Sequence, residues 1–234
     1  MSENKTQEIE NIRESREQRR KELGLPSYTI VEEIMNAITH GIGAGLAIAA
    51  IAILPVFSPK NPKSILSLLA YAITLFILYI ISTVYHSLGI NKAKKVFRIL
   101  DHCSIFLLIA GTYTPISILM IGGSVGWTIF GIIWAVAAIG ITLNAINLNK
   151  FARVSLVCYI AMGWCVVFAI NPLIASITSY QLWMLIWGGI AYTVGAVLYA
   201  VGKKIKYMHS IWHLFVLAGS LLHFLMIFDY ISAM

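Results

Sequence analysis

Charge is scarce in this chain of 234 residues, since Asp, Glu, Lys and Arg together make up only 12% of it. A soluble globular domain carries about 25% charged residues. Hydrophobic residues reach 59%, and the mean hydropathy is +0.82. The composition therefore excludes an ordinary soluble domain and predicts an integral membrane protein. The net charge of +7 is spread along the chain rather than gathered into one patch, so we expect no nucleic-acid partner.

Other common signals are also missing. The sequence has no Gly-rich phosphate loop, no G-x-S-x-G motif and no internal repeat. The three cysteines, Cys103, Cys158 and Cys165, form no C-x-x-C pattern, so we expect neither a disulfide framework nor cysteine ligands to zinc. The first 28 residues contain no apolar run before a small-residue cleavage site, so we expect no secretory signal peptide.

The hydrophobic residues are gathered into seven stretches, each close to the ~20 residues that a helix needs to cross a bilayer. These stretches are 32–56, 64–88, 99–121, 125–147, 153–175, 180–201 and 209–231. They predict an all-α seven-transmembrane helix bundle over residues 29–234. Residues 1–28 are rich in both signs of charge and predict a solvated, partly helical tail that ends at Pro26, with Glu17 and Lys21 well spaced to pair.

Positive charge alternates between the segments that join these stretches. All but two of the Lys and Arg residues, Lys60 and Lys63, lie in the tail or in every second connection. The positive-inside rule then places the N-terminus in the cytoplasm and, after seven crossings, the C-terminus outside. We therefore expect a multi-pass protein of the cell membrane.

Several ionisable side chains lie at the cytoplasmic ends of these crossings. His86 ends the second, Asp101 begins the third, and His209 and His213 open the last. Such groups are costly near hydrocarbon unless they are paired or bind metal. The two histidines of H-S-I-W-H lie on one helix face, about 6 Å apart along the axis, and can share one zinc ion. The pattern predicts a Zn²⁺ site at this depth.

Two further side chains could serve this site. Ser82 lies one turn before His86 and is placed to bond a water or a carboxylate beside the metal. Asp101 could be a fourth ligand, but we favour a role in orienting metal-bound water. His223 is ten residues beyond His213, about 15 Å farther along the helix, and is too far away to bind the same ion.

The remaining polar and aromatic features favour structural roles. A polar face of the first crossing is expected to form hydrogen bonds within the bundle rather than to bind metal; it carries Glu33, Asn36 and His40. His102 should point about 100° away from Asp101. Pro115 should bend the third helix and could open a cavity there. The tryptophans are expected to be interfacial anchors: Trp127, Trp134, Trp183, Trp187 and Trp212.

At these residues the chain resembles the hemolysin III family, the bacterial branch of the progestin and adipoQ receptors. The matching segments are E-E-I-M-N-A-I-T-H-G-I-G (32–43), S-T-V-Y-H (82–86), R-I-L-D-H (98–102), A-G-T-Y-T-P (110–115) and H-S-I-W-H-L-F-V-L-A-G-S-L-L-H-F (209–224). The resemblance implies a zinc ion held by His86, His209 and His213, with a water between the zinc and Asp101, and Ser82 nearby. Its wider superfamily includes alkaline ceramidases. We expect no counterpart of the long N-terminal regulatory domain of the animal receptors, so hormone sensing is not expected to transfer.

Together these observations predict a zinc-dependent hydrolase of a lipid amide or ester that contributes to membrane-lipid homeostasis. Three imidazoles leave zinc one open position, and its bound water would be the nucleophile. Asp101 would accept a proton, and Ser82 would orient water or stabilise the oxyanion. Membrane lipids or fatty-acyl compounds are the expected partners, while the substrate and the oligomeric state stay open.

Three alternatives remain. The zinc site could stabilise a lipid sensor that lacks turnover. Glu33, His40 and His223 could form the relay of a channel or proton-linked transporter. A pore-forming hemolysin is the least favoured, because this chain itself spans the membrane.

Overall fold

The computed structural model describes residues 2–202 and 205–234, without the side chains of residues 2–6, 9, 12 and 13. Four of the basic residues counted above, Lys5, Arg13, Lys203 and Lys204, therefore lie outside the described residues or side chains. The described part of the chain is built of helices and short turns and contains no strand. The expected all-α architecture is confirmed.

The helices follow the predicted stretches closely. They are α1 (Ser2–Glu22), α2 (Ile30–Phe57), α3 (Pro62–Ser87), α4 (Lys92–Pro115) with a π-helical turn (Ile116–Ile121), α5 (Gly123–Trp164) with a 3₁₀ turn (Cys165–Ala169), α6 (Ile170–Ile174), α7 (Ser179–Val201) and α8 (Met208–Ser232). Six helical stretches within the described residues are long and apolar enough to cross a membrane, and one of them runs from Gly123 to Ile174.

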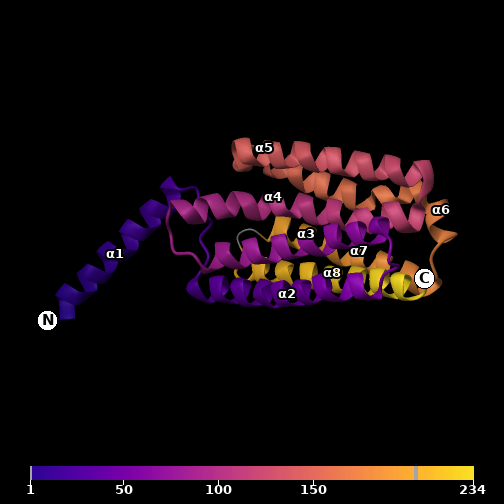
Figure 1. Ribbon diagram of the computed structural model, residues 1–234. Coiled ribbons are helices and arrows are strands. Elements are labelled where there is room, and N and C mark those ends of the chain that lie inside the picture. The colour runs from indigo at the N-terminus through magenta and orange to yellow at the C-terminus, as the bar shows by residue number, and fades with distance from the viewer. Residues whose placement is uncertain (1, 203–204) are drawn as a thin grey trace.

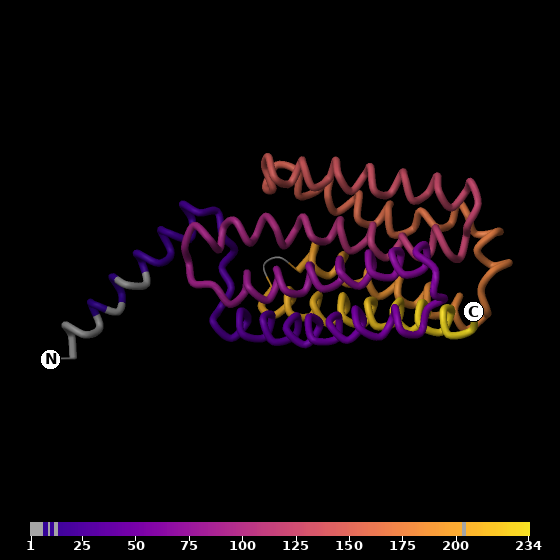
Figure 2. The backbone as a smooth tube through the Cα atoms, viewed as in Figure 1, coloured from indigo at the N-terminus to yellow at the C-terminus, as the bar shows by residue number. Residues whose placement is uncertain are grey.

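This longest stretch folds back on itself at Asn147, whose backbone is not helical (φ −160°, ψ 91°). Ser155 donates a hydrogen bond of 2.6 Å to Oδ1 of Asn144. In an unbroken helix these two residues would be about 16 Å apart along the axis. Asn147 also caps the second arm by accepting the backbone N–H of Lys150. The two arms lie side by side in Figure 1 and Figure 2, so this stretch supplies two crossings, and the described chain makes the seven that were predicted.

The crossings are arranged in a closed ring, in which α2 contacts α3, α3 contacts α4, α4 contacts α5, α5 contacts α7, α7 contacts α8, and α8 returns to α2. Large side chains such as Tyr71, Tyr79 and Phe106 fill its interior. Many apolar side chains point outward, and Phe168 is 90% exposed, which suits a surface that faces lipid. The helix α1 extends away from one end of the bundle, and the C-terminus lies at the other (Figure 1).

Two expectations for the tail were wrong. The helix α1 ends before Gly24 rather than at Pro26, because Gly24 adopts φ +63° and the N–H of Leu25 bonds back to the carbonyl of Arg20. This is the Schellman arrangement that glycine favours at the end of a helix. Glu17 pairs with Arg20 rather than with Lys21. Arg98 of α4 then donates to the carbonyl of Gly24 at 2.6 Å, which fixes the linker against the bundle.

Two of the tryptophans expected at the interfaces have partners inside the bundle. Trp134 donates to the Thr114 hydroxyl of α4 at 3.1 Å, and the Trp212 ring lies 5.0 Å from the His209 ring. Trp134 thus uses its indole N–H and Trp212 uses its ring to contact a neighbouring helix or side chain of the bundle. The other three, Trp127, Trp183 and Trp187, are more than half exposed. Directly after Pro115 the α geometry of α4 gives way to the π-helical turn, while the bend expected at Pro115 stays a prediction.

Candidate metal centre

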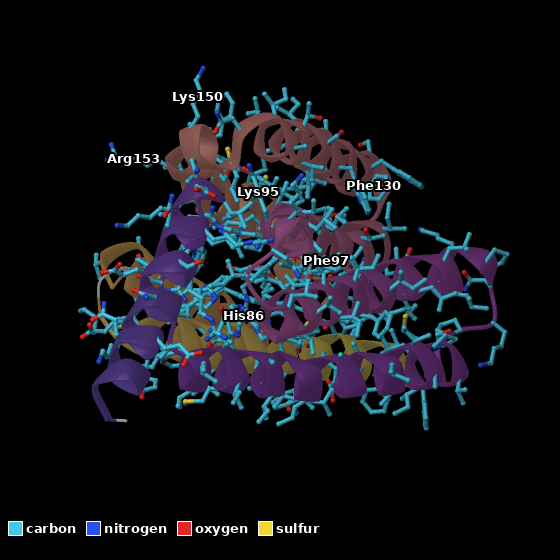
Figure 3. All side chains as sticks on the ribbon, turned by 90° about the vertical axis from the view of Figure 1, so that its left-hand side faces the viewer. His86, Lys95, Phe97, Phe130, Lys150 and Arg153 are labelled. Carbon is cyan, nitrogen blue, oxygen red and sulfur yellow. The ribbon has the colours of Figure 1, made fainter. Side chains whose placement is uncertain are left out.

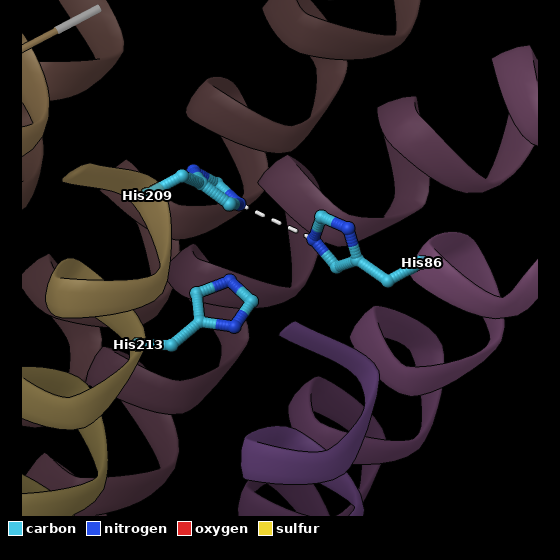
Figure 4. A group of neighbouring side chains, drawn as sticks. All are labelled: His86, His209 and His213. Carbon is cyan, nitrogen blue, oxygen red and sulfur yellow. Dashed lines mark hydrogen bonds between the residues drawn. The ribbon is translucent and has the colours of Figure 1, made fainter. Parts of the chain in front are cut away.

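Two helices bring the three predicted histidine ligands together. His86 lies in the last turn of α3, and His209 and His213 lie in the first two turns of α8. All three are buried. Their rings gather around one point in Figure 4, where a dashed line joins His86 and His209. Figure 3, viewed from the tail end, places His86 inside the bundle, while Lys150 and Arg153 lie at its periphery.

The geometry of these histidines suits a metal ion. Their ligand atoms all lie within 4.8 Å of one another, and the Nε2 atoms of His86 and His209 are 3.2 Å apart. Tetrahedral zinc with nitrogen ligands at ~2.0–2.1 Å sets those nitrogens about 3.3 Å apart. Both ring nitrogens of His213 and Nδ1 of His209 are buried without a hydrogen-bond partner among the described residues. Because an unsatisfied buried polar atom costs about 1–3 kcal/mol, a shared metal ligand role accounts for this arrangement well. The three residues, hereafter the histidine triad, could hold a metal ion.

The polar face of α2 lies against this triad. The Oε2 atom of Glu33 is 2.6 Å from Nδ1 of His86, and the His40 ring stacks on the His213 ring with centroids 3.5 Å apart. Asn36 accepts a hydrogen bond of 2.5 Å from Ser210, the neighbour of His209. The face therefore does form hydrogen bonds within the bundle. That one of them reaches a predicted metal ligand could not be predicted from the sequence, because nothing in the local pattern relates α2 to α3.

The two predicted catalytic side chains are both buried. The Ser82 hydroxyl lies one turn before His86 and has no hydrogen-bond partner among the described residues. Asp101 is 4% exposed, and its Oδ2 has no hydrogen-bond partner there, although it lies 3.8 Å from Nδ1 of His102. Asp101 is not part of the histidine group whose ligand atoms lie within 4.8 Å of one another.

A cavity of about 430 Å³ lies between α4, the second arm of α5, α7 and α8. Its lining is mostly apolar and includes Asp101 near one end and Ile116 near the other. These two residues are fifteen apart on one helical stretch, about 22 Å along its axis. His40 and Trp212 also line the cavity, and their rings contact the triad, so the cavity lies one side chain away from the three histidines. Its volume is within the ~300–1,000 Å³ typical of small-molecule sites.

The other two histidines lie apart from the triad. His102 lines the cavity beside Asp101, and its Nδ1 donates to the carbonyl of Arg98. His223, which is ten residues beyond His213, donates from Nε2 to the carbonyl of Leu185. It lies deeper in the bundle, as the rise of a helix requires.

Tyr28 is a residue of this site that the sequence analysis missed. Its ring stacks on the His209 ring, with centroids 4.9 Å apart, and lies 5.9 Å from the His86 ring. Burial raises the pKa of the Tyr28 hydroxyl well above its ordinary value, so the group is a neutral hydrogen-bond donor at physiological pH. Its position just before the first crossing was the only sequence signal.

Comparison with known proteins identifies the family. A family model described as haemolysin-III related matches residues 28–224. The chain belongs to this family. Hemolysin-3 of Bacillus cereus is 43% identical over 204 residues, which cover 86% of this chain and 93% of that protein. The Hemolysin-3 homolog of Bacillus subtilis (strain 168) is 40% identical over 205 residues, covering 87% and 96%.

A more distant human relative shares the same region. The monocyte to macrophage differentiation factor of Homo sapiens is 29% identical over 209 residues, which cover 87% of this chain and 86% of that protein. The matched region contains all five sequence segments that carried the resemblance. The expected haemolysin III membership is confirmed, and with it a multi-pass membrane protein.

Proposed function

We propose that this haemolysin III protein is a zinc-dependent hydrolase of lipid amide or ester bonds that contributes to membrane-lipid homeostasis. The observation that carries the proposal is a buried histidine triad beside a long, mostly apolar cavity. A metal centre at that place suits a substrate whose acyl chain fills the cavity while its polar linkage reaches the triad.

The chain supplies the groups that such a reaction needs. The triad would hold the zinc ion, which when bound would supply a Lewis acid for a carbonyl and a bound water with its pKa lowered to about 7. Asp101 is buried, and its Oδ2 has no hydrogen-bond partner in the part of the chain that the structure describes, so this carboxylate is available to accept a proton. The Ser82 hydroxyl is similarly available to orient the reacting groups. The apolar cavity wall excludes bulk water and strengthens these polar interactions.

We place the site at the cytoplasmic leaflet. The triad lies at the end of the bundle from which α1 extends, where α4 begins with Lys92, Lys94, Lys95 and Arg98. The positive-inside rule assigns such an end to the cytoplasm, which places the N-terminus inside and the C-terminus outside. The reacting bond of a membrane lipid would then meet the triad near headgroup level.

Metal analysis of the purified wild type beside His209→Ala tests the metal centre first. We expect about one zinc per wild-type chain and loss of zinc from the variant, because a ligand is removed. Equal metal content in both proteins would refute the site.

Lipid mass spectrometry then tests the chemistry. We expect cleavage products with the wild type that disappear with a chelator. Asp101→Asn should keep zinc yet lose turnover, because an amide cannot accept the proton. Undiminished turnover by this variant would remove Asp101 from the reaction.

A lipid sensor without turnover is the second candidate. It is favoured by the triad's position, because a metal there would tie the end of α3 to the start of α8, beside the cavity. Bound lipid without product over long incubation would support it. The transporter alternative has less support, because Glu33 and His40 contact the triad while His223 bonds to a backbone carbonyl.

A further inference from the structure

We propose that Glu33 is a positioning residue for the metal centre and that Lys94 holds it in place. The inference rests on the metal centre of the proposed function, but not on hydrolysis. It starts from a contact between three helices: Glu33 from α2, His86 from α3 and Lys94 from α4.

The Glu33 carboxylate determines which nitrogen of His86 faces the triad. Its Oε2 is 2.6 Å from Nδ1 of His86, and the His86 side chain is fully buried. A carboxylate accepts a hydrogen bond, so the ring proton resides on Nδ1 and the lone pair on Nε2. The Nε2 atom is the one that faces His209, at 3.2 Å. Such carboxylate–histidine pairs fix the orientation and raise the basicity of a metal ligand.

Lys94 in turn fixes the carboxylate. Its ammonium lies 2.9 Å from Oε1 of Glu33 and donates to the carbonyls of Tyr85 and Leu88 at 3.0 and 2.8 Å. These three acceptors match the three N–H groups of an ammonium, which explains how a lysine can be only 4% exposed here. Because both carbonyls flank His86 in the chain, Lys94 secures the backbone around His86 and its carboxylate partner together.

The same helix α2 also secures the start of α8. Glu32 accepts the backbone N–H of Tyr207 at 2.7 Å, and Tyr207 has the left-handed backbone (φ +63°) that precedes α8. Asn36 accepts from Ser210, beside His209. Both helices that carry the triad are therefore held against one polar face of α2, and Glu33 is the member of that face with a charged bond to a triad ring.

Zinc affinity separates positioning from simple support of the fold. The full chain is purified in detergent, stripped of metal and titrated with zinc against a chromophoric chelator. We expect Glu33→Gln, which keeps the side-chain shape, to weaken zinc binding about 10–100-fold. Lys94→Met should weaken it as well, and Glu33→Asp should recover part of the loss because it restores a carboxylate. The cobalt(II) form should show a changed visible spectrum in Glu33→Gln, a change that loss of stability alone would not cause.

Two matched controls make the same chemical changes elsewhere. Asp229→Asn converts a carboxylate that pairs with Gln181 near the far end of α8, and Lys95→Met removes an exposed charge beside Lys94. Both should bind zinc like the wild type.

The outcomes distinguish this inference from the proposed function. Wild-type affinity in Glu33→Gln would overturn the inference and leave the metal centre standing. A wild type that binds no zinc would overturn both. If Glu33→Gln does not fold, Lys94→Met decides, and unchanged zinc affinity in that variant would overturn the role assigned here.

Discussion

The contact between α3 and α4 gives a sharp test of the fold that supports the site. Gly111 of α4 faces Thr74 of α3, and a Cβ added at Gly111 would lie 1.7 Å from Oγ1 and 2.7 Å from Cβ of Thr74. Thr74 cannot turn aside easily, because its side chain is β-branched and its hydroxyl bonds the carbonyls of Ala70 and Tyr71, each at 2.9 Å. Gly111→Ala must therefore push the two helices apart.

The size of the effect follows from two opposing terms. Overpacking in a filled interior costs about 1–3 kcal/mol. Alanine favours a helix interior over glycine by about 1 kcal/mol. Because the added Cβ would come as close as 1.7 Å, we take the upper part of the overpacking range and expect Gly111→Ala to lower the free energy of unfolding by about 1–2 kcal/mol. The measurement is reversible unfolding in mixed detergent, followed by tryptophan fluorescence. Zinc content should fall at temperatures where the wild type retains it, because α3 carries His86.

Two further variants show whether the reasoning is correct. In Gly45→Ala the added Cβ meets nothing within 4 Å, so stability should not fall. Thr74→Ala in the Gly111→Ala background removes the shortest contact but keeps the Cβ at 2.7 Å, so it should recover part of the loss. A stable Gly111→Ala, or a double variant no better than the single one, would refute the assigned contact.

Three other predictions concern separate parts of the molecule. Asn144→Ala should lower the free energy of unfolding by about 1–3 kcal/mol in the same assay, because the buried Ser155 hydroxyl loses its partner across the reversal of α5. An unchanged unfolding midpoint would contradict the pairing of the two arms. Gly24→Ala forces φ +63° on a residue with a side chain, at a cost of about 1–2 kcal/mol, and should speed protease cleavage between α1 and α2. Ala196→Phe places a ring in the cavity of about 430 Å³. It should reduce the amount of acyl lipid that co-purifies, measured by mass spectrometry, without changing the zinc content. The same amount of lipid in the variant and the wild type would place the ligand elsewhere.

The sequence alone determined the number of crossings and which three histidines form the triad. Hydropathy and the alternation of charge are local properties, so they could be read without knowing how the helices pack. The spacing of His209 and His213 likewise places both on one helix face through the rise of the helix alone. The reversal at Asn147 was located to within a few residues for the same reason, since hydrophobic runs on either side are each one bilayer long.

Only the tertiary structure decided which groups surround the triad. Glu33 and Lys94 are separated by about sixty residues, yet Glu33 meets both His86 and Lys94. That meeting depends on the rotation of α2, α3 and α4 about their axes, and rotation is set by side-chain packing between helices rather than by hydrophobicity along one of them. The same packing gave Trp134 and Trp212 partners inside the bundle and brought the Tyr28 ring over His209. Composition alone would assign these aromatic side chains to the membrane surface, because it does not show which partners the folded bundle offers them.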